Sequence, residues 1–90
     1  MPHVMIPSVL RPQVGDQSRL EVDGTSVGEV LNTIAAQYPE FGKRLFADAT
    51  KLNRYINVFV NEEDIRFLQQ LETPVGAKDE VTLIPSIAGG

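Results

Sequence analysis

The segment from Ser26 to Pro39 constrains the fold more than any other part of this sequence. Ser26 and Glu29 have the S-x-x-E spacing of a capping box, in which each side chain satisfies a free backbone N–H at the start of a helix. From Val27 onward apolar residues recur every three or four positions, and Pro39 disfavours a helical conformation at Tyr38. We therefore predict one amphipathic helix that begins at Val27, ends at Tyr38 and lies on a sheet.

Segments with β-strand character lie on both sides of this helix. Apolar and polar residues alternate over residues 18–22 and 54–61, the pattern of a half-buried strand. Residues 3–10 and 81–87 are apolar and rich in β-branched residues, and we expect a local irregularity at Pro7 because proline cannot donate a ladder hydrogen bond. Four main strands are therefore predicted.

Weaker patterns fill the remaining stretches. We expect a short helical turn at Phe41–Phe46, an exposed loop over 48–53, a polar turn over 61–64 and a short edge strand over 65–67.

A helix between two β units predicts an α+β fold, with one main helix packed on one face of a mixed sheet. Because the helix crosses between the second and third main strands, we place the first and last strands side by side at the centre. Ninety residues leave room for a single domain over 1–90. The predicted core is aliphatic: Val4, Ile6, Leu20, Val22, Val30, Leu31, Ile34, Ile56, Val58, Val60, Val81 and Leu83.

Composition excludes several classes of function. The chain has no cysteine, which excludes disulfides, thiolate metal sites and a cysteine nucleophile. A net charge of −4 with dispersed lysines and arginines disfavours nucleic-acid binding and favours a partner with a basic surface. No apolar run approaches the roughly 20 residues of a membrane span, and the start lacks the features of a signal peptide, so we expect a cytoplasmic protein without a membrane partner.

The side chains offer little catalytic apparatus. His3 has no serine or carboxylate at motif spacing, and we expect it to be solvated. The acidic residues 62–64 lack the spacing of a calcium loop, and the glycines form no phosphate-binding motif. No metal site, bound cofactor or enzymatic activity is predicted.

What remains is the carboxyl end, where an apolar strand runs into a small-residue tail ending in Gly89 and Gly90. A terminal Gly-Gly alone is weak evidence, because small residues are common at chain ends. After a β core, however, it presents the Gly90 carboxylate on a tether without side chains, which can enter a narrow channel. We expect the tail, residues 86–90, to be flexible.

The segments VFVNEEDIRF at 58–67, DEVTLIPSIAGG at 79–90 and MIPSVLRP near the start resemble the ubiquitin-fold sulfur carriers of the ThiS and MoaD family. The resemblance covers nearly the whole chain and is greatest to the actinobacterial carriers that deliver sulfur for cysteine biosynthesis. It implies a β-grasp fold and a carrier that uses its partners' catalysis. An E1-like enzyme would adenylate the Gly90 carboxylate with ATP and convert it to a thiocarboxylate, with Gly89 as the access route.

The resemblance to carriers of cysteine biosynthesis also implies two further partners. One is a pyridoxal-phosphate cysteine synthase that accepts the sulfur, and the other is a zinc-dependent peptidase that releases the product. The residues leave other acceptors open, among them thiazole, dithiolene, tRNA and siderophore-like products. They also leave open a ubiquitin-like modifier attached to lysines, and an inert interaction domain.

A partner-binding surface is predicted on the sheet face away from the helix. Strand alternation places Met5, Phe59 and Ile84 there, and Ile87 and Ala88 extend it toward the terminus. The alternative is that these residues are scattered surface apolar side chains.

Overall fold

The computed structural model describes residues 1–48, 51–53 and 55–85, and its main sheet has the predicted mixed topology. The strands are β1 (His3–Met5), β2 (Arg19–Glu21), β5 (Ile56–Val60), β6 (Glu63–Asp64) and β7 (Glu80–Pro85), in the order β2-β1-β7-β5-β6. β1 and β7 are parallel neighbours, and the other pairs are antiparallel. The first and last strands therefore lie side by side, as predicted.

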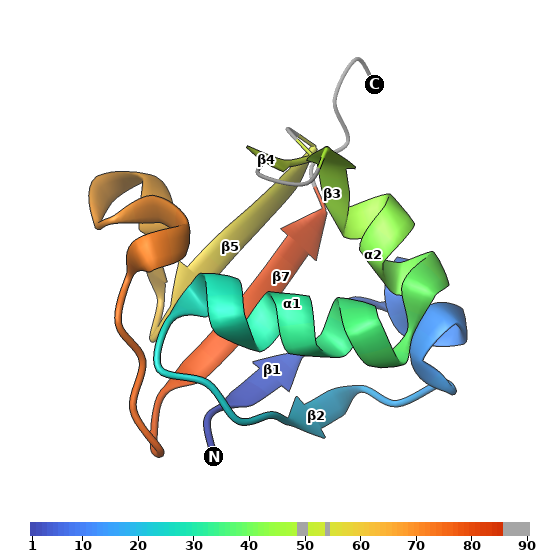
Figure 1. Cartoon of the computed structure of the whole chain (residues 1–90), viewed down its shortest axis with the longest axis horizontal. Helices are drawn as coiled ribbons and strands as arrows, with labels where there is room; N and C mark the ends of the chain where they lie inside the picture. Colours follow the sequence, from blue (N-terminus) through green and yellow to red (C-terminus); the bar gives the residue numbers. More distant parts are fainter. Residues whose placement is uncertain (49–50, 54, 86–90) are drawn as a thin grey trace.

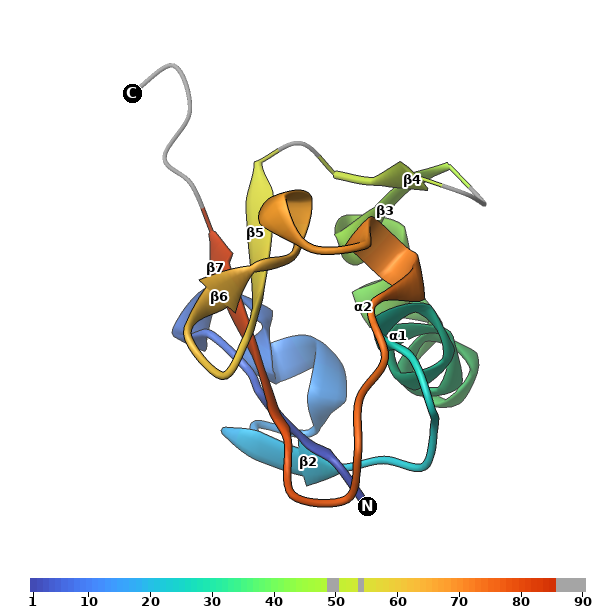
Figure 2. The same ribbon diagram turned by 90° about the vertical axis from the view of Figure 1, so that its left-hand side faces the viewer.

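Helices cover one face of this sheet. The main helix, α1 (Val27–Gln37), crosses it diagonally and is followed by α2 (Pro39–Leu45), as Figure 1 shows. A two-stranded hairpin of β3 (Phe46–Asp48) and β4 (Lys51–Leu52) lies over one end of the layers (Figure 2). This is the β-grasp arrangement, and the predicted α+β fold class is confirmed.

The start and end of α1 follow from local sequence. The Ser26 hydroxyl accepts a hydrogen bond from the Glu29 backbone N–H at 3.2 Å. The Glu29 carboxylate bonds the Thr25 N–H at 3.1 Å, one residue before its predicted partner. The helix ends at Gln37, with Tyr38 as the cap before Pro39. Its apolar face, with Leu31 and Ile34 among its residues, is fully buried.

The core contains all the predicted aliphatic residues except Ile56, which is only partly buried. It also contains side chains that the prediction omitted, most of them from short helical segments: Leu10, Val14, Val27, Phe41, Leu45, Ile65 and Val75. Segments with weak periodicity therefore supply a substantial part of the core.

The first predicted strand is too long. β1 ends at Met5, and residues Ser8–Val14 form a 3-10 helix, η1, that buries Leu10 and Val14. Pro7 has no N–H for a ladder, and its carbonyl instead accepts a hydrogen bond from Leu10 at 2.9 Å. The proline therefore ends the strand rather than bending it.

Three further boundaries differ from the prediction. The expected loop over 48–53 contributes to the β3–β4 hairpin, and the expected edge strand at 65–67 is a 3-10 helix, η2 (Ile65–Phe67). The edge strand is β6, two residues earlier, and a third 3-10 helix, η3 (Gln70–Glu72), follows η2. β7 ends at Pro85 within the described residues.

Candidate functional site

The central strand β7 leads the chain toward its Gly-Gly end. From Val81 opposite Val60 to Pro85 opposite Ile56, β7 pairs with β5, and its first half, Glu80 to Thr82, also pairs with β1. Pairing on both sides fixes the direction of the strand. The predicted site residues Ile87, Ala88, Gly89 and Gly90, together with Ser86, lie outside the described residues.

The other predicted surface residues are on neighbouring strands of the sheet face away from α1. Met5 of β1 and Phe59 of β5 are both paired with Thr82 of β7, so these three side chains form one row across the sheet. Ile84 lies in the next row, opposite Asn57. Ile84 is 44% exposed, whereas Met5 and Phe59 are half-buried. The face is thus an apolar row interrupted by neutral polar residues.

Charged side chains border this face at the amino end of β7. His3 Nε2 lies 3.0 Å from Glu80 Oε1, and Glu21 is the strand partner of His3 on its other side. His3 is therefore only 19% exposed, and the prediction of a solvated histidine is wrong. No local pattern could indicate this pair, because its members are 77 positions apart in the chain.

Asp79 anchors the segment that leads into β7. Asp79 accepts hydrogen bonds from the Gly76 N–H at 2.7 Å and the Asn61 amide at 2.8 Å, which hold the pKa of its carboxyl below the usual range. Asn61 also accepts a hydrogen bond from the Glu80 N–H at 3.0 Å. These contacts fix where β7 begins.

Asp64 has the same role at the edge of the sheet. It accepts hydrogen bonds from the Arg66 guanidinium, the shortest at 2.8 Å, and from the Arg66 backbone N–H at 2.9 Å. Both lower the pKa of the Asp64 carboxyl. Asp64 thereby caps η2, and the aspartate and arginine neutralise each other.

The described residues contain no cluster of three histidine or acidic side chains that could hold a metal ion. Within the same part of the chain no helix is long and apolar enough to cross a membrane. The candidate site is the sheet face at Met5, Phe59 and Ile84, beside the strand that leads to the carboxyl end.

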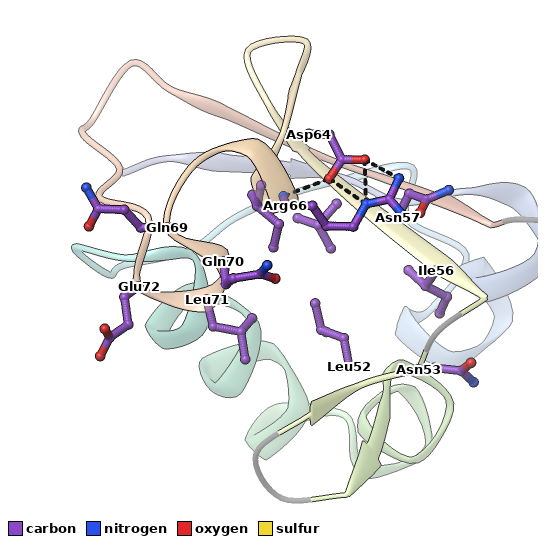
Figure 3. Close-up of a pocket in the computed structure, with 12 residues that line it drawn as sticks. Leu52, Asn53, Ile56, Asn57, Asp64, Arg66, Gln69, Gln70, Leu71 and Glu72 are labelled. Atoms are coloured by element: carbon purple, nitrogen blue, oxygen red, sulfur yellow. Dashed lines mark hydrogen bonds and ion pairs between the residues drawn. The ribbon is translucent and has the colours of Figure 1, made fainter.

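A cleft of about 650 Å³ lies between β5, the β3–β4 hairpin and the η2–η3 segment, and sequence reasoning missed it (Figure 3). Leu52, Ile56 and Leu71 give it apolar walls, and Gln69 and Gln70 are among its polar lining residues. No periodic pattern could have revealed it, because its walls come from loops and short elements brought together only by the fold.

Comparison with known proteins gives consistent relatives. The model of the ThiS family matches residues 4–90. The sulfur carrier protein CysO of Mycobacterium tuberculosis is 38% identical over 89 residues, which cover 97% of this chain and 96% of that protein. The small archaeal modifier protein 3 of Haloferax volcanii is 31% identical over 86 residues, covering 92% of this chain and 91% of the relative.

A solved structure extends the likeness to three dimensions. The crystal structure of the Amycolatopsis orientalis BexX/CysO complex contains a chain that matches this one with a TM-score of 0.90 and 36% sequence identity. The match covers 100% of both chains. The predicted resemblance is thus found in both sequence and fold.

Proposed function

The chain belongs to the ThiS family, and on that premise we propose that it carries sulfur as a thiocarboxylate on Gly90. The observation that carries the proposal is the match to the CysO sulfur carriers over nearly the full length of both chains. The position of β7 supports it, since this doubly paired strand ends at Pro85 and the sequence continues into the Gly-Gly end. In this role the chain is a co-substrate of its partner enzymes, and it binds no cofactor of its own.

The chemistry needs an external activating enzyme. A carboxylate is anionic and a poor electrophile, so its oxygen first attacks the α-phosphorus of ATP, forming an acyl-adenylate and releasing pyrophosphate. A hydrosulfide-equivalent nucleophile then adds to the carbonyl carbon, the bond to the phosphate oxygen breaks, and AMP leaves. Gly89 and Gly90 leave room for both reactants because they carry no side chain.

For the pathway, we propose cysteine biosynthesis, which the similarity to CysO supports. The partners would then be an E1-like adenylating enzyme, a sulfur-accepting synthase that uses pyridoxal phosphate, and a zinc-dependent peptidase. A complex of CysO with BexX supports partner binding by a carrier of this fold. The tail residues Ile87 and Ala88 would enter the partner together with the two glycines.

Intact mass of the protein purified from its own host tests this function. We expect a fraction of the chains to be heavier by the replacement of one oxygen by one sulfur at the C-terminus. Gly89→Val should abolish this gain because a β-branched side chain blocks the channel. Ala77→Val, an exposed change that precedes β7 and lies at the opposite end of that strand from Pro85, should keep it. Normal sulfur loading of Gly89→Val would contradict the proposal.

The sheet face of Met5, Phe59 and Ile84 is proposed as the docking surface for the activating enzyme. Phe59→Asp and Ile84→Asp should slow ATP–pyrophosphate exchange by the host's activating enzyme and leave the fold intact, because a charge replaces apolar contact area. Val9→Asp, at a 60% exposed position on η1, is the matched control. Full exchange activity in both face variants would remove this surface from the proposal.

A protein modifier is the second candidate function, favoured by the identity to the archaeal modifier protein. In that case Gly90 would form isopeptide bonds with lysines of other proteins. Denaturing gels of host extract, probed for this chain, would show conjugates that disappear when Gly90 is deleted.

A further inference from the structure

The 3-10 helix η2 exposes an aromatic side chain that the fold itself does not use. Phe67 is 84% exposed, the highest value among the exposed large hydrophobic residues of the described chain. The adjacent Leu68 is 37% exposed, whereas Ile65 anchors the same segment in the core at 2% exposure. Phenylalanine and leucine side by side on a surface form an apolar patch, and such patches are typical of protein contacts.

Near it, the turn between β5 and β6 contains a residue in an unfavourable conformation. Asn61 and Glu62 have φ values of 50° and 76°, and they close a two-residue hairpin in which Val60 pairs with Glu63. Turns of this kind favour Asn followed by Gly. The hydrogen bonds from Asn61 to Asp79 and from Glu80 to Asn61 account for the positive φ of Asn61. Glu62 is exposed, and no hydrogen bond within the described residues accounts for its positive φ, which glycine would adopt without strain.

The charges along this edge are unbalanced. The side chains of Glu62 and Glu63 are exposed and bond to no other residue in the described part of the chain. The nearby cation, Arg66, is already paired with Asp64 at 2.8 Å. We use the name edge surface for Glu62, Glu63, Phe67 and Leu68, four exposed residues that supply two negative charges and two apolar side chains.

The edge surface is distinct from the sheet face at Met5, Phe59 and Ile84. Its residues lie in the β5–β6 turn, on the edge strand β6, on η2 and at the C-cap of η2, at the end of the strand order. Met5 and Ile84 lie on the more distant strands β1 and β7, and Phe59 lies on β5, next to the edge strand. Two enzymes that handle the same terminus in turn would compete for a single docking surface. A second surface allows the second enzyme to recognise the carrier through different residues.

We propose that the edge surface docks the sulfur-accepting enzyme, through an apolar pocket on that enzyme bordered by lysine or arginine. This inference rests on the proposed carrier function. Charge complementarity selects a basic partner surface, because Glu62 and Glu63 have no cationic partner among the described residues and the whole chain has a net charge of −4. The same charge disfavours a second copy of this chain as the occupant.

The test uses full-length carrier that has first been loaded with sulfur, so that acceptor recognition is measured apart from loading. Sulfur transfer to the host's purified acceptor enzyme is followed by intact mass for wild type, Phe67→Ala and Glu62→Gly. Phe67→Ala should raise the KM for carrier at least about fivefold, as for an interface anchor, with kcat unchanged. Val9→Ala, which removes an exposed apolar side chain on η1, should leave KM unchanged.

Glu62→Gly separates a structural role from a binding role. Glycine relaxes the turn, so the melting temperature should rise, while the KM for transfer should increase about twofold and depend less steeply on salt. A purely structural residue would change stability without changing KM.

An unchanged KM in Phe67→Ala, or an effect of this variant on loading rather than on transfer, would overturn the assignment of the edge surface. Wild-type chain that never acquires sulfur would overturn the proposed function, and this inference with it. The two failures are therefore distinguishable by the mass of the wild-type carrier.

Discussion

Where α1 crosses β1 and β7, the apolar side chains are sealed from solvent, but around the β3–β4 hairpin similar side chains border an open cleft. Val4, Leu31 and Val81 in the closed region have no exposed area. Leu52, Ile56 and Leu71 in the open region are only partly buried. In Figure 2 the strands of the main sheet lie on the left, α1 and α2 on the right, and the β3–β4 hairpin above them.

The difference indicates that stability and exposed apolar surface come from different regions of this small domain. A domain of this size gains little stability beyond what one compact core supplies. The closed region places that core under β7, and β7 is also hydrogen-bonded to β1 on one side and to β5 on the other. In the open region apolar side chains such as Ile56 and Leu71 stay partly exposed, so we expect this region to contribute less to stability.

The largest expected effect separates the two regions directly. Leu31→Ala should lower the free energy of unfolding by about 2 to 5 kcal/mol, because it leaves a cavity among fully buried side chains. Leu71→Ala, beside the cleft, should cost only about 1 kcal/mol. Urea denaturation measures both. Equal losses would show that the open region is as much a part of the core as the closed one.

Two glycine substitutions test the same comparison with smaller expected changes in stability. A Cβ at Gly42 would lie 2.8 Å from the Ala35 Cβ where α2 packs on α1, so Gly42→Ala should destabilise the protein by about 1 to 3 kcal/mol.

At Gly28 of α1, a Cβ would meet the Leu71 backbone oxygen at 3.0 Å, on the short 3-10 helix η3. We expect this clash to be offset by the helix propensity of alanine, worth about 1 kcal/mol, so Gly28→Ala should change thermal stability little. A loss as large as that of Gly42→Ala would show that η3 is held as rigidly as α2.

The smallest effect concerns acid stability at the edge of the open region. Hydrogen bonds from Arg66 depress the folded-state pKa of Asp64, so its contribution is present above the unfolded value of about 3.9 and is lost as pH falls through the lower folded value. Asp64→Asn should therefore destabilise the protein slightly at pH 7, and the difference from wild type should vanish in acid.

Thermal melts of both proteins between neutral and acidic pH measure this difference. A constant difference at every pH would mean that the Asp64 side chain acts through packing rather than through its charge.

Local signals predicted much of this molecule. The S-x-x-E spacing and Pro39 fixed both ends of α1, because capping and the proline clash act within one helical turn. Alternation identified β2, β5 and the core face of β7, since a strand with one buried face has a period of two residues. The Gly-Gly end and the resemblance to the family were also evident from the sequence, and the ThiS family model matches the chain as predicted.

Contacts between distant segments were decided only by the tertiary structure. The His3–Glu80 pair, the cleft and the partial exposure of Ile56 depend on strands and loops far apart in the chain. Phe67 shows the limit most clearly: within an apolar stretch it could belong to a strand, but the fold placed it on a 3-10 helix and exposed it. Periodicity reports the local repeat of the backbone, whereas burial depends on which other segments pack against it.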